Sequence, residues 1–498
     1  MRKPPSSIST LFYRISPVLL GFLCLALFAW WLFSGEREAD KERVRLPLKH
    51  VRGSAAKKGT PANEGTLIAG QGKPSSWPGD WPQFRGPNRD NLARSSRPLA
   101  ASWPKAGPPV VWRIPVGEGH AGAVIRQGRV YLVDYDRRKW EDAIRCLSLD
   151  DGREIWRYTY SVEVKRNHGM SRTVPAVNDR FLVAMGPMCH VHCLEPVTGK
   201  LVWKMDLVRD YGTKVPPWYA GQCPLIDGDK AILAPGGKPL MMAVDLATSN
   251  VLWRTPPQYD DMGMTHSSIL PIEFAGKRQY VYCTGQGVVG VSARDGSVLW
   301  TKPEWKIGFA NIPSPVWLGD GRIFFSGGYN KGSLMIRLVA KGDAIRVEDV
   351  FSRRANEFGS DQQTPILYEG HIYGVQPKPA EMVCMDLEGK RLWTSGGERR
   401  FGLGPYLIVN DMLLVVDDQN GTLHLAKAGP SGYNELAQAK LLEGHDAWGP
   451  MAFAEGRLIL RDLTEMVCVD LVSQSASLPV SQSVSSPVGE FVVRALAR

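Results

Sequence analysis

The side chains best suited to bind or react with a small molecule lie in a set of short polar loops, each of which precedes a predicted β-strand. Among them, Arg172 could hold an anionic group, and His266 or Asp361 could transfer a proton. The other candidate ligand-binding residues of these loops are His168, Trp218, Tyr219, Gln222, Thr265, Asn311, Gln362 and Trp448. Together they suit a small polar ligand, or a quinone stacked on a Trp. The alternative is a water-filled, hydrogen-bonded lining that holds no ligand.

A second candidate is the segment Cys189-His-Val-His-Cys193, whose residue types could bind a metal ion. His190 and His192 are two residues apart and can share one face of a strand, whereas Cys193 would point to the other face. We interpret the segment as a hairpin with incidental Cys and His, and a zinc site at His190 and His192 is the weaker alternative. The sequence contains no nucleophile elbow, phosphate loop or other hydrolytic motif.

These loops recur because the chain itself repeats. The segment Asp295-Gly-Ser-Val-Leu-Trp300 turns on Asp-Gly and places a Trp four residues after the Gly. The same pattern begins at Asp151, Thr198 and Glu388, and a looser copy has Ser249 at the glycine position. The residues Trp156, Trp203, Trp253 and Trp300 are 47, 50 and 47 residues apart, and Trp393 follows after 93, close to two steps. A period of this size, marked by a turn and an aromatic residue, indicates a repeat architecture.

Each repeat contains four predicted strands, of which the first often begins with Pro. The second strand is the most regular, and its eight copies are Arg129–Val133, Arg180–Val183, Ala231–Leu233, Gln279–Tyr282, Arg322–Phe325, His371–Tyr373, Met412–Val416 and Arg457–Leu460. Four strands in a repeat of about 45 residues are typical of a β-propeller blade. The fold class is therefore all-β, an eight-bladed propeller, and in such a fold the candidate loops face the central channel.

The two ends of the repeat region predict how the ring closes. The last repeat stops after Met466–Leu471 and lacks a fourth strand, whereas Val110–Pro115 is an unpaired fourth strand at the start. Pairing the two segments would close the ring and remove an exposed edge. The fifth repeat (about Phe309–Phe351) and the seventh (Phe401–Leu442) lack the Trp and are expected to pack as degenerate copies.

Composition narrows the functional classes. The chain has 498 residues and a net charge of +10, with basic and acidic residues interleaved. No basic, aromatic-rich element suggests a nucleic-acid partner. The eight cysteines form no closely spaced disulfide framework. Equivalent positions in successive repeats hold Cys146, Cys193, Cys384 and Cys468, which we expect to be small buried core residues.

The N-terminal region predicts a membrane anchor. Residues Ile15–Gly35 carry no charged side chain and, as a helix, would span about 30 Å, the thickness of a hydrocarbon core. A cleaved signal peptide is the alternative, but no small-x-small site closes the segment. We expect a single-pass anchor with the large domain exported. The predicted organisation is a short segment (1–14), the anchor (15–35), a flexible linker (36–76), an ordered extension (77–109), the propeller (110–471) and a disordered tail (472–498).

The repeated Gly turn with Trp four residues later resembles the pyrroloquinoline-quinone (PQQ) type of eight-bladed propeller, over about Trp77 to Leu471. One branch of that family comprises dehydrogenases that hold PQQ and usually calcium, and another comprises non-catalytic members such as the outer-membrane assembly lipoprotein B. The extension Trp81–Asp90 is similar to one found before the propeller in exported bacterial members. The dehydrogenases typically carry two adjacent cysteines over the cofactor, and this sequence has no Cys-Cys pair and no recognisable calcium set. It therefore supports no cofactor assignment, with PQQ and calcium as the alternative.

The resemblance and the anchor together predict a membrane-anchored, exported binding or scaffold module. Its expected partner is a protein at the cell envelope or a small polar ligand, and cell-envelope assembly is one role that the resemblance implies. The alternative function is a PQQ-dependent oxidoreductase that acts on an alcohol or a sugar. A third interpretation, a polysaccharide-binding propeller, predicts glycan binding without redox activity.

Overall fold

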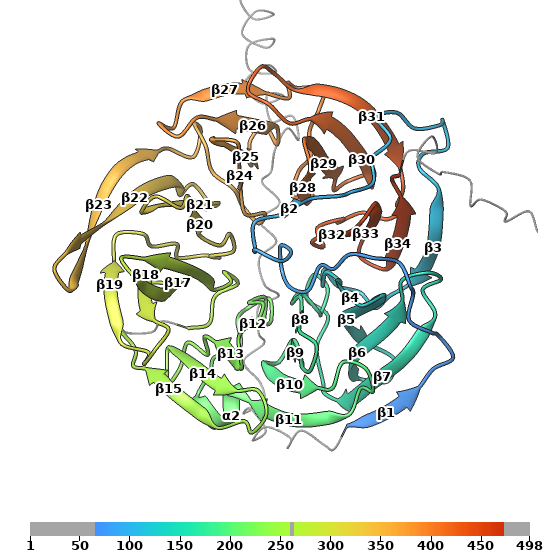
Figure 1. Ribbon diagram of the computed structural model, residues 1–498, viewed down its shortest axis with the longest axis horizontal. Helices are drawn as coiled ribbons and strands as arrows, with labels where there is room; N and C mark the ends of the chain where they lie inside the picture. Colours follow the sequence, from blue (N-terminus) through green and yellow to red (C-terminus); the bar gives the residue numbers. More distant parts are fainter. Residues whose placement is uncertain (1–64, 259–262, 473–498) are drawn as a thin grey trace, which may run out of the picture. The chain divides into compact units, whose positions relative to one another are not determined.

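The computed structural model describes residues 65–258 and 263–472, all within the compact unit Gly53–Arg498. These residues form eight sheets around a central axis, each sheet being one propeller blade (Figure 1). The predicted all-β, eight-bladed propeller is therefore confirmed. Within the described ranges no helix is both long enough and apolar enough to cross a membrane, and the predicted anchor Ile15–Gly35 lies outside them.

The first four blades each contain four consecutive antiparallel strands. Blade 1 contains β4 (Val124–Arg126), β5 (Arg129–Asp136), β6 (Glu141–Ser148) and β7 (Glu154–Ser161), and β1 (Thr66–Ala69) adds a fifth strand outside β7. Blade 2 contains β8 (Ala176–Val177), β9 (Leu182–Met185), β10 (His190–Leu194) and β11 (Leu201–Asp206), followed by the short helix α2 (Leu207–Tyr211). Blade 3 contains β12 (Leu225–Asp227), β13 (Lys230–Leu233), β14 (Met241–Asp245) and β15 (Val251–Thr255). Blade 4 contains β16 (Leu270–Phe274), β17 (Lys277–Thr284), β18 (Gly287–Ser292) and β19 (Val298–Lys302).

The remaining blades follow the same plan. Blade 5 contains β20 (Val316–Trp317), β21 (Arg322–Gly327), β22 (Gly332–Lys341) and β23 (Ala344–Arg353). Blade 6 contains β24 (Ile366–Tyr368), β25 (His371–Val375), β26 (Met382–Met385) and β27 (Arg391–Thr394). Blade 7 contains β28 (Tyr406–Val409), β29 (Met412–Asp417), β30 (Thr422–Lys427) and β31 (Asn434–Lys440), with β2 (Leu92–Ala93) beside β28. Blade 8 contains β32 (Ala452–Ala454), β33 (Arg457–Arg461) and β34 (Glu465–Asp470), completed by β3 (Val110–Pro115).

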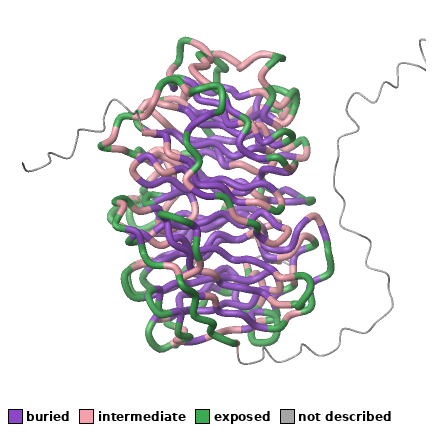
Figure 2. Tube along the Cα trace, turned by 90° about the vertical axis from the view of Figure 1, so that its right-hand side faces the viewer, coloured by how far each residue is buried: buried purple, intermediate pink, exposed green. Residues whose placement is uncertain are grey.

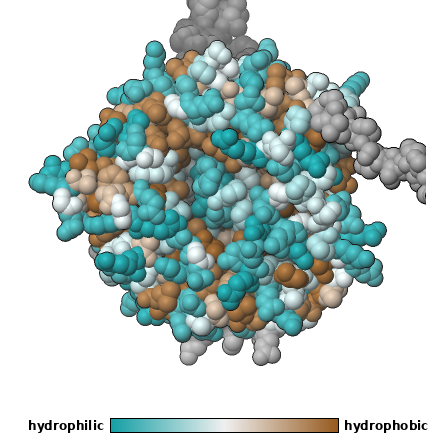
Figure 3. All heavy atoms as spheres, viewed as in Figure 1, coloured by the Kyte–Doolittle hydropathy of each residue, from teal (hydrophilic) through white to brown (hydrophobic). Residues whose placement is uncertain are grey.

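The core lies between the blades. The middle strands of a blade are almost wholly buried, as β17 and β18 show, because a neighbouring blade packs on each of their faces. The outer strands are more exposed, and in β23 no residue is fully buried. Figure 2 shows the same division, with buried residues running through the layers and exposed residues at the loops. Figure 3 shows hydrophobic residues scattered among hydrophilic ones on the face in view.

Five of the repeated Trp residues join their blade to the next. The indole N–H of Trp156 in blade 1 donates to the Pro196 carbonyl oxygen of blade 2 at 3.1 Å. The equivalent bonds run from Trp112 to Leu149, from Trp203 to Leu246, from Trp253 to Ala293 and from Trp393 to Gly429. Trp300 departs from the pattern and donates to the Gln279 side chain of its own blade at 2.8 Å. In the next blade the turn between β22 and β23 is at Gly342, where no atom lies within 4 Å of an added Cβ.

The turn glycine is required both by its backbone and by space. Gly199 has a φ of +74°, and a Cβ at this position would lie 2.6 Å from the Trp156 ring. Gly296 meets Trp253 in the same way, and Ser249 of the looser copy keeps the left-handed backbone with a φ of +65°. The repeat pattern is thus a packing device, because these turns receive an aromatic ring of the preceding blade, which is Phe351 instead of an indole at Gly389.

The repeat cysteines lie opposite these Trp residues across the third and fourth strands. Cys146 pairs with Trp156, Cys193 with Trp203, Cys384 with Trp393 and Cys468 with Trp112. All four are free and buried, which confirms that they are small core residues. In blade 4 the position is Gly290, where a Cβ would overlap the Trp300 ring. The residue opposite the indole must therefore be small.

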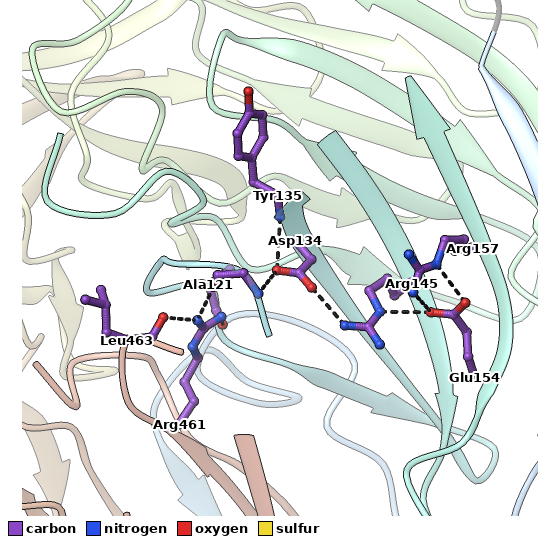
Figure 4. Close-up of polar contacts among 9 residues, drawn as sticks. Ala121, Asp134, Tyr135, Arg145, Glu154, Arg157, Arg461 and Leu463 are labelled. Atoms are coloured by element: carbon purple, nitrogen blue, oxygen red, sulfur yellow. Dashed lines mark hydrogen bonds and ion pairs between the residues drawn. The ribbon is translucent and has the colours of Figure 1, made fainter. Parts of the chain in front are cut away.

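The ring closes as predicted. β3 pairs antiparallel with β34, so that Arg113 lies opposite Val467. Arg461 reinforces this seam by donating to the carbonyl oxygens of Gly117, Ala121, Asp462 and Leu463 (Figure 4). The network continues into blade 1, where the Asp134 carboxylate accepts from the Gly117 N–H and from Arg145. Arg145 and Arg157 in turn share Glu154.

A second set of hydrogen bonds runs around the axis rather than along the blades. Just before the first strand of each blade, a backbone N–H donates to the side chain at the same position of the next blade. The four bonds run from Val174 to Cys223, from Cys223 to Ser268, from Ser268 to Ser314 and from Ser314 to Thr364. They join blades 2 to 6. At the equivalent positions of blades 7 and 8, Gly404 and Gly449 have no side chain to accept such a bond.

Residues 77–93, which we call the plug, lie across the axis on the side of the hairpins between first and second strands (Figure 1). Trp81, only 1% exposed, forms a β-bridge with Ile125 of blade 1. The Pro82 carbonyl oxygen accepts from Val177 of blade 2, and β2 pairs in parallel with β28 of blade 7. The plug therefore lines the inner edges of blades on both sides of the axis.

Candidate functional site

The predicted binding residues lie at the opposite end of the axis from the plug. We call this end the loop face, because it carries the connections from the fourth strand of one blade to the first strand of the next. First strands run from the loop face toward the plug. All predicted binding residues from His168 to Trp448 are in these connections. The structure thus places them on one face, and their side chains differ in what they contact.

Arg172 holds its own loop together. Its Nε donates to the Trp218 carbonyl oxygen at 2.5 Å, and its Nη2 lies 3.0, 2.8 and 3.4 Å from the carbonyl oxygens of Asn167, His168 and Gly169. The residue is half-buried, and burial lowers the pKa of its guanidinium to about 10. Arg172 therefore stays charged at neutral pH, but its donors already serve main-chain oxygens that join blades 2 and 3.

His266 lies next to this arginine. Its ring is 6.5 Å from the Trp218 ring between centroids and packs so closely on Gly221 that a Cβ there would overlap it. Burial, and secondarily the charge of Arg172, lower the pKa of His266 to about 4. Its Nε2 is a buried atom with no hydrogen-bond partner among the described residues. At neutral pH His266 is thus an uncharged polar group, which suits hydrogen bonding better than proton transfer.

Aromatic side chains continue from this pair toward Asp361. Trp218 and Phe309 meet edge to face at 5.1 Å, and Phe309 meets Tyr329 at 4.7 Å. Phe309 is 36% exposed. Asp361 accepts from the Tyr329 backbone N–H at 3.2 Å, and Gln362 lies partly exposed beside it. Three connected aromatic rings from blades 3 to 5 therefore form a step on the loop face, with Arg172 and His266 at one end and Asp361 at the other.

Three of the predicted residues instead bind the main chain or side chains of a blade: Gln222 and Thr265 bind the blade that follows their connection, and Asn311 binds the blade that precedes it. Gln222 is fully buried and exchanges hydrogen bonds with the main chain of Ala234. Thr265 bonds to Tyr282 and to the Cys283 carbonyl oxygen. Asn311 donates to the Thr284 carbonyl oxygen at 3.0 Å. Their side chains hold the connections in place, as the water-lined alternative also requires.

The remaining predicted residues occupy other parts of the face. Trp448 stacks on His120, with centroids 4.6 Å apart and planes at 20°, and its indole N–H donates to Asp418 at 2.7 Å. The Tyr219 hydroxyl donates to the Lys165 carbonyl oxygen, and the His168 carbonyl oxygen lies 3.0 Å from His120 Nε2. These contacts tie the connections of blades 8, 1, 2 and 3 to one another. Trp448 is thus not part of the aromatic step.

His190 and His192 share one face of β10, as predicted, and point toward blade 1. Both rings contact Tyr160, whose hydroxyl is hydrogen-bonded to the buried carboxyl group of Asp142. Cys193 points the other way and packs between blades 2 and 3. Within residues 65–258 and 263–472, no three His, Cys, Asp or Glu side chains are arranged to hold a metal ion. The histidines therefore belong to a buried polar cluster between blades 1 and 2.

Sequence reasoning missed two functional candidates, Arg85 and Arg89 of the plug. Both are only 3% exposed, and both reach carbonyl oxygens of residues that directly precede first strands of the propeller. The signal was a pair of arginines four residues apart in a segment whose aromatic residues have to be buried. The orientation of these two side chains could not be predicted, because the Pro and Gly content of the segment excludes a regular helix or strand. Only a regular element has a periodicity that indicates which way a side chain points.

Comparison with known proteins identifies the family. Residues 140–395 match the PQQ_2 family model, described as "Outer membrane protein assembly factor BamB", and these 256 residues are just over half of the 498. The chain belongs to this PQQ-like repeat family. A comparison with curated proteins found no match.

Solved structures of PQQ-like propellers share the fold. BamB from Moraxella catarrhalis has a TM-score of 0.51 at 12% identity, covering 72% of this chain and 99% of its own. Quinohemoprotein alcohol dehydrogenase from Comamonas testosteroni has a TM-score of 0.56 at 11% identity, covering 84% and 83%. A europium-containing methanol dehydrogenase has a TM-score of 0.50 at 13% identity, covering 79% and 89%. Identities this low show the fold alone.

The residues of this PQQ-like propeller do not fit the quinone that the family name implies. A quinone would stack on a predicted indole, but Trp448 is already covered by His120, and Trp218 is met edge to face by Phe309. All seven described cysteines are free and buried, and none adjoins another in sequence. Arg172, the cation predicted to hold an anionic group, is engaged with carbonyl oxygens. We therefore derive no chemistry through PQQ or calcium.

Proposed function

We propose that this chain is a membrane-anchored, exported PQQ-like propeller that acts as a binding module and docks a protein partner at the cell envelope through its loop face. The observation that carries the proposal is the aromatic step of Trp218, Phe309 and Tyr329. Trp and Tyr are enriched among residues that dominate the energy of protein interfaces. The match to a family described as an outer-membrane assembly factor supports the same role.

The polar residues around the step support binding rather than reaction. His266 has a pKa of about 4, and Arg172 already donates to main-chain oxygens. Asp361, the other predicted proton-transfer group, accepts from a backbone N–H. A rigid step next to a fixed cation and a fixed carboxylate can orient a partner with little loss of entropy on binding.

The uncharged segment Ile15–Gly35 supports the location. Fusing alkaline phosphatase after the propeller should give an active reporter, and a cytoplasmic reporter at the same position should be inactive. Deleting residues 15–35 should release the protein from the membrane fraction. A chain that stays cytoplasmic would contradict the exported location.

Photo-crosslinking in cells tests the docking surface. A benzoylphenylalanine at position 309 should give discrete adducts with one protein, and Trp218→Ala should weaken them. The matched control is position 252 on the outer strand β15, where the natural Leu is 51% exposed. Adducts of the same size and strength from both positions would contradict a specific surface at the aromatic step.

The oxidoreductase alternative is tested on the same purified protein. It is incubated with PQQ and calcium, and dye reduction is measured with alcohols and sugars. Saturable turnover would overturn the scaffold proposal. If none occurs while position 309 crosslinks, the binding function stands.

A further inference from the structure

The plug brings two positive charges into the ring. Arg85 Nη2 donates to the Pro365 carbonyl oxygen of blade 6 at 2.8 Å. Arg89 Nη1 lies 3.4 Å from the Pro224 carbonyl oxygen of blade 3. Both prolines directly precede first strands, which form the inner edges of the blades. The two guanidinium groups thus reach the lining of the axis from the end that the plug covers.

Neither group is fully satisfied. Arg85 makes one further bond, to the Asp90 carbonyl oxygen at 3.2 Å, and Arg89 makes one to the Gln83 side chain at 3.3 Å. Arg85 Nε and Arg89 Nη2 are buried and have no hydrogen-bond partner in the described part of the chain. No salt bridge to either arginine is seen there. The Asp90 carboxylate accepts from the Leu92 N–H and acts on Arg85 through its charge, without a hydrogen bond between the two side chains. Burial lowers the pKa of both arginines to about 10, so both remain charged at neutral pH.

Arg461 shows what a structural buried arginine looks like in this fold. It is 1% exposed, and its Nε, Nη1 and Nη2 all donate to carbonyl oxygens. A buried cation whose donors are only partly paired is costly, because it has lost its hydration. The negative charge of Asp90 favours the charged form of Arg85, but neither Arg85 nor Arg89 donates a hydrogen bond to a charged acceptor.

The plug backbone adopts an uncommon, left-handed conformation at both arginines. Arg85 and Arg89 have φ values of +64° and +59°, a conformation that side-chain-bearing residues rarely adopt. Gly86 lies between them, and a Cβ there would lie 2.8 Å from the Trp81 ring. Residues in such conformations persist when the surroundings hold them, and they are concentrated at ligand sites. Here the contacts of Trp81 with blade 1 and of β2 with blade 7 fix the plug backbone in this conformation.

We propose that Arg85 and Arg89 form a binding site for a small oxyanion, a carboxylate, phosphate or sulfate group, at the plugged end of the propeller axis. Guanidinium donors pair with planar or tetrahedral oxyanions in a fixed geometry. The unpaired Nε of Arg85 offers one N–H donor and the unpaired Nη2 of Arg89 offers two, so that each residue can donate to an oxyanion. The site is independent of the loop-face docking proposed above.

Calorimetry on the full-length protein in detergent tests this site. Inorganic phosphate and acetate are titrated separately at constant ionic strength in a chloride buffer, and the pair of titrations tells a phosphate site from a carboxylate site. Saturable binding of either is expected for the wild type. Arg85→Gln and Arg89→Gln should each weaken it by about tenfold or more, the effect of losing a charge-assisted hydrogen bond. Arg94→Gln, at an exposed arginine just after the plug, should bind as the wild type does.

Thermal unfolding gives a second readout that does not depend on binding heat. The midpoint of the wild type should rise with the anion that binds, whereas the midpoints of the Gln variants should not. Without that anion the Gln variants should lose little stability, because the loss of a few hydrogen bonds is offset by the removal of a buried charge. Arg85→Lys and Arg89→Lys, which keep the charge, serve if a Gln variant does not fold. A wild type that binds neither anion, or variants that respond as the wild type does, would overturn the proposal.

Discussion

The arginines at the two ends of the propeller axis differ in how completely their guanidinium groups are hydrogen-bonded. At the loop face, Arg172 donates to carbonyl oxygens of its own and the next connection, and its charge closes the loops. At the plugged end, Arg85 and Arg89 enter the ring from outside the blades, and each keeps an unpaired nitrogen. This difference distinguishes Arg172, which stabilises the connections, from Arg85 and Arg89, which we propose to bind an anion.

The ends also differ in what closes them. Around blades 2 to 6, hydrogen bonds from blade to blade line the axis, and the last of them joins Ser314 to Thr364. In blades 7 and 8 the equivalent positions are Gly404 and Gly449, and the plug packs on that arc through β2 and through the Trp77 indole, which donates to Ala454. A segment outside the repeats thus helps to close the plugged end, where it also packs on Ile125 of blade 1 and Val177 of blade 2. This makes the plug part of the fold as well as a candidate site.

The largest expected effect comes from removing the residue that anchors the plug. Trp81→Ala empties a site where the side chain is 1% exposed. It should lower the free energy of unfolding by about 3–5 kcal/mol, as large-to-small core changes do. Chemical denaturation measures the loss, and limited proteolysis should show faster cleavage within residues 77–93. Trp77→Ala is the control, because Trp77 is only partly buried and should cost less. Equal losses would mean that the plug has no single anchor.

The second prediction compares the arginines of the two ends directly. Arg172→Gln removes donors from several loop-face carbonyl oxygens, and it should cost about 2 kcal/mol because those oxygens lose their partners. Arg89→Gln should cost little in chloride alone, since it removes a charge without a counterion. Denaturation of both variants in the same buffer checks the contrast. If Arg89→Gln is the more damaging change, Arg89 is a structural residue like Arg461.

The sequence predicted the features that depend on local conformation and burial, namely the blades and the closure of the ring. Turn glycines need a positive φ and Trp residues need burial, so their spacing indicated the blades, and the unpaired strand Val110–Pro115 indicated the closure. Partners of polar side chains depend on which strands meet, and local patterns do not contain that information. Gln222 looked like a ligand-binding group and instead holds the main chain of Ala234. The direction of Arg85 and Arg89 was hidden for the same reason.

A third prediction concerns pH at the loop-face end of the junction between blades 1 and 2. Burial, with a smaller contribution from Asp134, raises the pKa of Asp142 to about 8, well above its value of about 4 in an unfolded chain. Between those values the folded protein holds a proton that the unfolded chain releases, so this group makes stability fall as pH rises from about 4 to 8. His192, with a pKa lowered by burial to about 3, works in the opposite direction below about pH 6.5.

Asp142→Asn isolates the contribution of Asp142. Relative to the wild type, the variant should gain up to about 1.4 kcal/mol of stability per pH unit in this window. Denaturation at pH 5, 6, 7 and 8 measures the difference, in which the contribution of His192 cancels. A constant difference between variant and wild type would show that Asp142 is ionised throughout.

The smallest expected effect lies at the rim of the plugged end. The Glu455 carboxylate accepts from the backbone N–H and hydroxyl of Ser96 at 2.9 and 2.8 Å, just beyond the plug. Water competes for these exposed donors, so Glu455→Gln should cost less than about 1 kcal/mol. Proteolysis of residues 77–93 should proceed as in the wild type. If this variant instead released the plug as Trp81→Ala should, the rim and not the buried Trp would hold Arg85 and Arg89 in the axis. The strained backbone of the two arginines would then need another cause.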